Sequence, residues 1–221
     1  MQPKRKSQRK HGYDYSQPGY YAVTVCTQNR SCLFGVIDNG DMRLNDAGRM
    51  IGKTWCEIPD HYPDIELDVM QIMPNHLHGI IVVREVGAAP CGRPNLRIEN
   101  GHKPQVGLRI ASPLCRSDFT IPGNGRAQGP SPTTLSDVME RFKSITTKRY
   151  IDGVRARGWH SFSGKLWQRS YHDRIIRNET ELNKIRTYIC NNPNDWGADE
   201  NYIEIQDRTC PCSRPSLSLG R

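Results

Sequence analysis

The sequence has 221 residues, which is enough for one domain of ordinary size with some length left for a loop or a tail. Lysine and arginine number 31 against 23 aspartate and glutamate, and the formal net charge of +8 favours a polyanionic partner, nucleic acid first, although solubility alone would explain it about as well. No stretch approaches the roughly 18 apolar residues of a membrane-spanning helix.

The eight cysteines and the N-terminal residues indicate the compartment. The cysteines contain no Cys-x-x-Cys pair, so we expect free thiols and no structural zinc site, and we interpret the closely spaced Cys210 and Cys212 as incidental. Residues 1–18 form a basic, polar arm that lacks the apolar core of a signal peptide. We therefore expect a cytoplasmic chain in a reducing environment.

In chain order, the hydrophobic patterns predict a strand, a helix, two strands, a helix, a strand and a last helix. These elements lie at residues 20–27, 44–58, 65–73, 76–84, from 135 onward, 166–176 and around 182–192. Asn45 is available as the N-cap of the first helix and Pro59 as its stop, and a capping-box-like segment from Thr134 to Asp137 precedes the second helix. This order predicts an α+β fold, an antiparallel sheet with helices on one face.

Glycine and proline interrupt the pattern between residues 85 and 132. We expect a long flexible insertion there, basic enough to touch DNA but more typical of a solvated loop. The chain then divides into the arm 1–18, a folded domain over 19–196 that contains this insertion, and a tail over 197–221.

The strand predicted over 76–84 carries the strongest local signal for chemistry, the segment His76-Leu77-His78. Alternation along a strand turns both imidazoles to the same side, where they can hold one divalent ion. Two surface or hydrogen-bonded histidines would give the same pattern, and a metal site needs a third ligand.

Tyr188 and Asn192 are one turn apart on the last predicted helix, so their side chains project together. An amide oxygen from Asn192 would complete a set of two histidines and one asparagine, with Tyr188 beside it. Spacing alone favours a simpler interpretation of the pair, in which Tyr188 is an aromatic residue that packs beside the helix and Asn192 is an ordinary end-of-helix residue before Pro193.

Three motifs in this order resemble the HUH single-tyrosine transposases, in particular the REP-associated tyrosine transposase branch. They are the segments from Met73 to Ile80, from Leu166 to Asp173 with Arg177, and from Tyr188 to Pro193, and the triplet Phe142-Lys143-Ser144 fits the same family. An isolated His-x-His is a weak signal, whereas three motifs in order are a specific one. The matching stretches cover roughly residues 12–84 and 133–196.

The resemblance implies a ferredoxin-like or RRM-like sheet that carries the histidine pair. It also implies that Tyr188 cleaves and rejoins single-stranded DNA through a 5′-phosphotyrosine, with Mg²⁺ or Mn²⁺ held by His76, His78 and Asn192. The implied substrate is single-stranded or hairpin DNA like the REP repeats, and the implied protein is a nucleoid-associated monomer or homodimer.

DNA contacts are expected from basic residues of the arm and of the family-like motifs, although solvated surface charge explains these residues equally well. They are Lys4, Arg5, Lys6, Arg9, Lys10, Lys143, Arg169 and Arg177. The main alternative function is a hairpin-binding protein of the same fold that does not cleave. A replication or mobilisation nickase and a metal hydrolase are weaker alternatives, and Tyr171 is a weaker nucleophile because no ligand lies one turn away.

Overall fold

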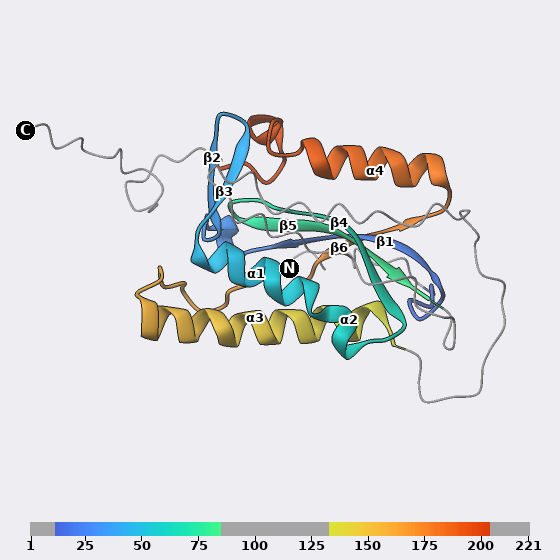
Figure 1. Ribbon diagram of the computed structural model, residues 1–221, viewed down its shortest axis with the longest axis horizontal. Helices are drawn as coiled ribbons and strands as arrows, with labels where there is room; N and C mark the ends of the chain where they lie inside the picture. Colours follow the sequence, from blue (N-terminus) through green and yellow to red (C-terminus); the bar gives the residue numbers. More distant parts are fainter. Residues whose placement is uncertain (1–11, 85–132, 204–221) are drawn as a thin grey trace, which may run out of the picture.

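The computed structural model describes residues 12–84 and 133–203 (Figure 1). The basic arm residues Lys4 to Lys10 and the insertion over 85–132 lie outside the described residues, as does most of the predicted tail. No helix within the described ranges is long and apolar enough to cross a membrane. The four described cysteines are free thiols, as expected.

Four strands form an antiparallel sheet in the order β4-β5-β1-β6. Their bounds are Gly19–Cys26 for β1, Ile65–Ile72 for β4, His76–Val83 for β5 and His172–Ile176 for β6. One helical connection leads from β1 to β4 and a second from β5 to β6, which is the β-α-β-β-α-β arrangement of ferredoxin-like folds. The α+β class and the antiparallel sheet are therefore confirmed.

The helices cover both faces of this sheet (Figure 1). Helices α1 (Asp46–Cys56) and α3 (Leu135–Arg157) pack together on one face, near the short α2 (Ile58–His61), whereas α4 (Glu179–Asn191) lies on the other. The expectation of helices on one face is wrong for α4. The physical reason is that both faces of the sheet are apolar and each needs a cover.

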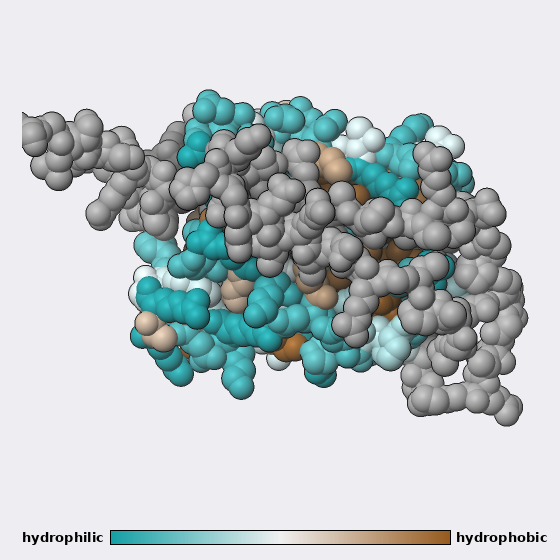
Figure 2. All heavy atoms as spheres, viewed as in Figure 1, coloured by the Kyte–Doolittle hydropathy of each residue, from teal (hydrophilic) through white to brown (hydrophobic). Residues whose placement is uncertain are grey.

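The side chains of β5 alternate between the two apolar cores on the two faces of the sheet. Leu77 and Ile81 belong to the core under α1 and α3, and Ile80 belongs to a second, smaller core with Leu182 and Ile189 of α4. Gly79 faces α1 so closely that a Cβ atom there would lie 2.5 Å from the Trp55 ring. Hydrophilic residues cover most of the described surface seen in Figure 2.

The predicted helix starts are confirmed. The Asn45 side chain accepts a hydrogen bond from the Gly48 amide at 2.9 Å, and Thr134 and Asp137 form a reciprocal capping box at the start of α3. The strand predicted over 166–176 is shorter than expected, because only its second half pairs with β1.

A hairpin between β1 and α1 was not predicted. Its strands, β2 (Gly35–Asp38) and β3 (Asp41–Leu44), flank Asn39 and Gly40, which both have positive φ. An Asn-Gly pair between short strands is a strong hairpin signal, so the sequence contained the means to find it.

Candidate metal centre and nucleophile

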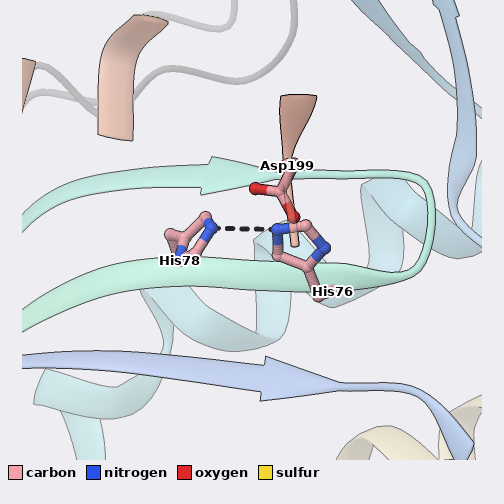
Figure 3. Close-up of side chains that lie close together, drawn as sticks. All are labelled: His76, His78 and Asp199. Carbon is pink, nitrogen blue, oxygen red and sulfur yellow. Dashed lines mark hydrogen bonds between the residues drawn. The ribbon is translucent and has the colours of Figure 1, made fainter. Parts of the chain in front are cut away.

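Strand β5 presents His76 and His78 on the face that α4 covers, and both side chains are buried. Their Nε2 atoms are 2.9 Å apart, and the rings meet edge to face (Figure 3). Two neighbouring ligands about 2.1 Å from an octahedral ion lie about 3 Å from each other. The pair therefore has the spacing of two ligands of one ion.

The Asn75 side chain fixes the tautomer of His76. Its amide nitrogen donates to the carbonyl oxygens of Arg30 and Asn201, at 3.0 and 2.9 Å. Its oxygen must then accept from Nδ1 of His76, 2.8 Å away. Nδ1 therefore carries the hydrogen, and Nε2 of His76 presents a lone pair.

A similar contact holds the other imidazole. The hydroxyl of Thr24, on β1, lies 2.8 Å from Nδ1 of His78. The strand register pairs these two residues directly, which brings the hydroxyl to the ring. When this Nδ1 donates to the hydroxyl, both Nε2 atoms offer lone pairs to one point, which is what a metal ion requires.

Burial also keeps both imidazoles neutral. It lowers the pKa of His78 to about 4 and that of His76 well below its usual value of 6.5. The neighbouring charge of His78 lowers the pKa of His76 further. Histidine binds metal as the neutral ring, so protons do not compete with a metal for this pair at neutral pH.

Asp199, which follows the short helix η2 (Trp196–Ala198), joins the histidines (Figure 3). The ligand atoms of His76, His78 and Asp199 all lie within 4.8 Å of one another, so this group could hold a metal ion. The carboxylate accepts from the backbone amide of Asn201 at 2.6 Å. Sequence reasoning missed Asp199 because it falls in the segment interpreted as a tail and no spacing links it to the histidine motif.

Asn192, the residue predicted as the third metal ligand, caps the C-terminus of α4 and is buried. Its amide nitrogen donates to the Asp199 carboxylate at 3.0 Å, whereas its oxygen is buried without a hydrogen-bond partner in the described part of the chain. An unsatisfied buried acceptor costs about 1–3 kcal/mol. A cation or a hydrogen-bond donor bound beside this oxygen would satisfy it.

Tyr188 lies beside the histidine pair on α4. Its side chain is 51% exposed, and its ring centroid is 5.5 Å from that of His78. Burial raises the pKa of Tyr188, the carboxylates of Asp199 and Glu200 raise it further, and Asn192 opposes them. The phenol is therefore protonated at neutral pH and needs a proton acceptor before it can attack.

An ion pair and apolar contacts hold α4 in this position. The Arg186 guanidinium donates to the Asp68 carboxylate through Nε at 3.0 Å and Nη2 at 2.5 Å, and Asp68 is almost fully buried on β4. Leu182 and Ile189 pack against the sheet on the same side. Tyr188 thus faces the histidines of its own chain.

The predicted DNA-contacting residues are spread over the fold. The Lys143 ammonium donates to the carbonyl oxygens of three successive residues, 168–170, at 2.7, 3.1 and 3.4 Å, so it holds this segment in place. Arg169 and Arg177 are exposed, one before β6 and one after it. Tyr171 is buried in the core on the α3 side, away from the histidines.

No family model matches the chain. Two solved structures are similar: a REP-associated tyrosine transposase bound to a REP hairpin (15% identity, 82% of this chain, 70% of that chain, TM-score 0.43) and a transposase candidate from Deinococcus radiodurans (14%, 82%, 94%, TM-score 0.39). Similarity this low supports no functional conclusion. An uncharacterized protein of Haemophilus influenzae is 33% identical over 203 residues, which are 90% of this chain and 94% of the relative. The chain belongs to the same protein family as this Haemophilus protein.

Proposed function

We propose that the chain is a single-strand DNA transposase of the HUH type, which cleaves and rejoins DNA through a 5′-phosphotyrosine at Tyr188. The observation that carries the proposal is the position of this tyrosine, half exposed and 5.5 Å from His78, whose Nε2 converges with that of His76. A nucleophile beside converging metal ligands is the arrangement that phosphodiester exchange needs.

In this proposal His76, His78 and the amide oxygen of Asn192 hold Mg²⁺ or Mn²⁺. The oxygen of Asn192, which has no hydrogen-bond partner among residues 12–84 and 133–203, and the facing Nε2 atoms support this ligand set. When bound, such an ion supplies Lewis-acid polarisation of the scissile phosphate and fixes its orientation.

The phenolic oxygen of Tyr188 attacks the phosphorus and the bond between phosphorus and the 3′ oxygen breaks. The 3′ oxygen takes up a proton from solvent and leaves as a hydroxyl, and the tyrosine keeps the 5′ phosphate. We assign Asp199 as the acceptor of the phenolic proton, because its carboxylate lies at the histidine pair and is among the groups that raise the pKa of Tyr188. A second 3′ hydroxyl then displaces the tyrosine in the reverse reaction. The phosphodiester is exchanged rather than hydrolysed, so no ATP is needed.

The proposed substrate is hairpin DNA of the REP kind with a single-stranded flank, and the proposed active unit is one chain. The second point is supported by the packing of α4 on its own sheet, through Leu182, Ile189 and the Arg186–Asp68 pair. A protomer that brings its own tyrosine to its own histidines does not need to exchange this helix with a partner.

The test is covalent capture of labelled single-stranded hairpins with Mg²⁺ or Mn²⁺, read on a denaturing gel. The Tyr188→Phe variant is expected to form no adduct. Tyr202→Phe is the matched control, since Tyr202 is also exposed, at 40%, and its ring packs on Trp196, which in turn contacts His76. An adduct that survives Tyr188→Phe contradicts the proposal, and tight binding without any adduct across many hairpins favours the non-cleaving alternative.

A further inference from the structure

A second surface feature lies away from the tyrosine, on the sheet face that carries α3. There the C-terminal half of α3 and residues 164–169 enclose an open groove of about 660 Å³, called here the α3 groove. Besides Lys143, whose ammonium donates to the carbonyl oxygens of residues 168–170, two cations line it from the helix and two from the facing segment. These four are Lys148, Arg155, Lys165 and Arg169.

These four cations have no charge partners in the part of the chain that the structure describes. All four are exposed, and none of them forms an ion pair or a side-chain hydrogen bond there. Among the described residues that line the groove there is one acid, Asp152, which forms no ion pair with any of them. By contrast, Arg149 on another side of the same helix pairs with Glu57. Four cations around one carboxylate repel one another and attract a polyanion.

The walls of the groove are fixed in place. Lys148, Asp152 and Arg155 recur at helical spacing and so share one face of α3. The facing segment is tied to the end of β1, because Gln28 donates to the carbonyl of Leu166 at 2.8 Å and Gln168 donates to that of Cys26 at 2.9 Å. The cations are therefore presented by a rigid scaffold.

The spacing and lining of the groove indicate what it binds. Lys148 and Arg155 are seven residues apart, which is about 10 Å along a helix. About three phosphates of one DNA strand cover that length of duplex axis. Trp167, the aromatic residue of the lining, is only 4% exposed and offers no ring surface for base stacking. Phosphate contacts without base contacts position a nucleic acid but do not read its sequence.

We propose that the α3 groove binds the phosphate backbone of the DNA substrate at a distance from the cleaved bond and without regard to base sequence. This inference rests on the proposed DNA function. One DNA molecule can reach both the groove and the histidine pair. Residues 166–168, at the groove, bond to the end of β1, and at this end Cys26 pairs with His76.

The test is DNA binding by the full chain, measured by fluorescence anisotropy between about 50 and about 200 mM salt. The test variant is Lys148→Ala/Arg155→Ala. The matched control, Lys53→Ala/Arg141→Ala, also removes two exposed cations on the same side of the sheet but outside the groove. Labelled single strands and hairpins, each in native and scrambled sequence, serve as probes.

Each phosphate contact to a single strand contributes about 0.7 to the slope of log affinity against log salt. The test variant is therefore expected to lose about 1.4 from this slope and about 25-fold in affinity near 0.1 M salt, equally for native and scrambled DNA. A loss confined to single strands or to hairpins identifies the part of the DNA that occupies the groove.

An unchanged slope in the test variant, an equal loss in the control, or a loss seen only with the native sequence overturns the proposal. Anisotropy reports binding and not cleavage. Failure of this inference is therefore distinguishable from failure of Tyr188 to form an adduct, which would contradict the proposed function itself.

Discussion

Replacing Asn75 with alanine should weaken the metal site through His76. The side chain makes three hydrogen bonds, two to carbonyl oxygens and one to Nδ1 of His76, and is itself buried. Each contributes about 1 kcal/mol net, so Asn75→Ala should lower the free energy of unfolding by about 3 kcal/mol. Removing the group that orients a metal-binding histidine typically costs about 10–100-fold in metal affinity.

The loss of metal affinity is separated from the loss of stability by measuring Mn²⁺ affinity by electron paramagnetic resonance at a temperature where the variant remains folded. Asn45→Ala is the control, because that asparagine side chain likewise bonds to the backbone, through two hydrogen bonds at the start of α1 and away from the histidines. It should lower stability and leave Mn²⁺ affinity unchanged. Nitrogen-15 spectra of the metal-free wild-type protein should show His76 protonated at Nδ1. Protonation at Nε2, or unchanged Mn²⁺ affinity in Asn75→Ala, would contradict the role of Asn75 in orienting His76.

Three further predictions concern the site and its support. Asp199→Asn should slow adduct formation on the order of 10²-fold or more in single-turnover assays, with a rate that rises more steeply with pH, and an unchanged rate contradicts the assigned role. Arg186→Ala leaves the Asp68 carboxylate buried and unpaired, so urea unfolding should show a loss of about 3 kcal/mol, most of it recovered when Asp68→Asn is added. In metal-free protein the unfolded chain takes up a proton at His78 below pH 6.5, whereas the folded chain does so only near pH 4. The free energy of unfolding should therefore fall as the pH drops from 6.5 to 4, by about 3 kcal/mol from His78 alone. A free energy of unfolding that stays constant over this range excludes the lowered pKa.

The elements that carry the site were predictable because each has a local signal. Strand alternation placed His76 and His78 on one face, and helical spacing placed Tyr188 one turn before Asn192. The structure has both arrangements. Both arrangements depend only on residues that are close together in the sequence, so they can be predicted without knowledge of tertiary contacts.

The remaining features depend on contacts between distant segments. Helix α4 covers the sheet face that carries Ile80 and Ile176, because the core with α1 and α3 already occupies the other face. The strand pattern alone does not predict which face a helix covers. Asp199 reaches the histidines only because the chain turns back after α4, where the Asn201 carbonyl accepts from Asn75. Neither the long sequence separation nor the turn leaves a spacing signal.

Mass spectrometry of the trapped adduct shows directly whether Tyr188 becomes covalently linked to DNA. Protein incubated with single-stranded hairpins and Mn²⁺ is digested with nuclease and protease, and the modified peptide is sequenced. The expected product is a nucleotide joined through its 5′ phosphate to the oxygen of Tyr188, with a free 3′ hydroxyl on the released strand. A linkage to Tyr202, Tyr171 or any other residue, or cleaved DNA without a linkage, would contradict it.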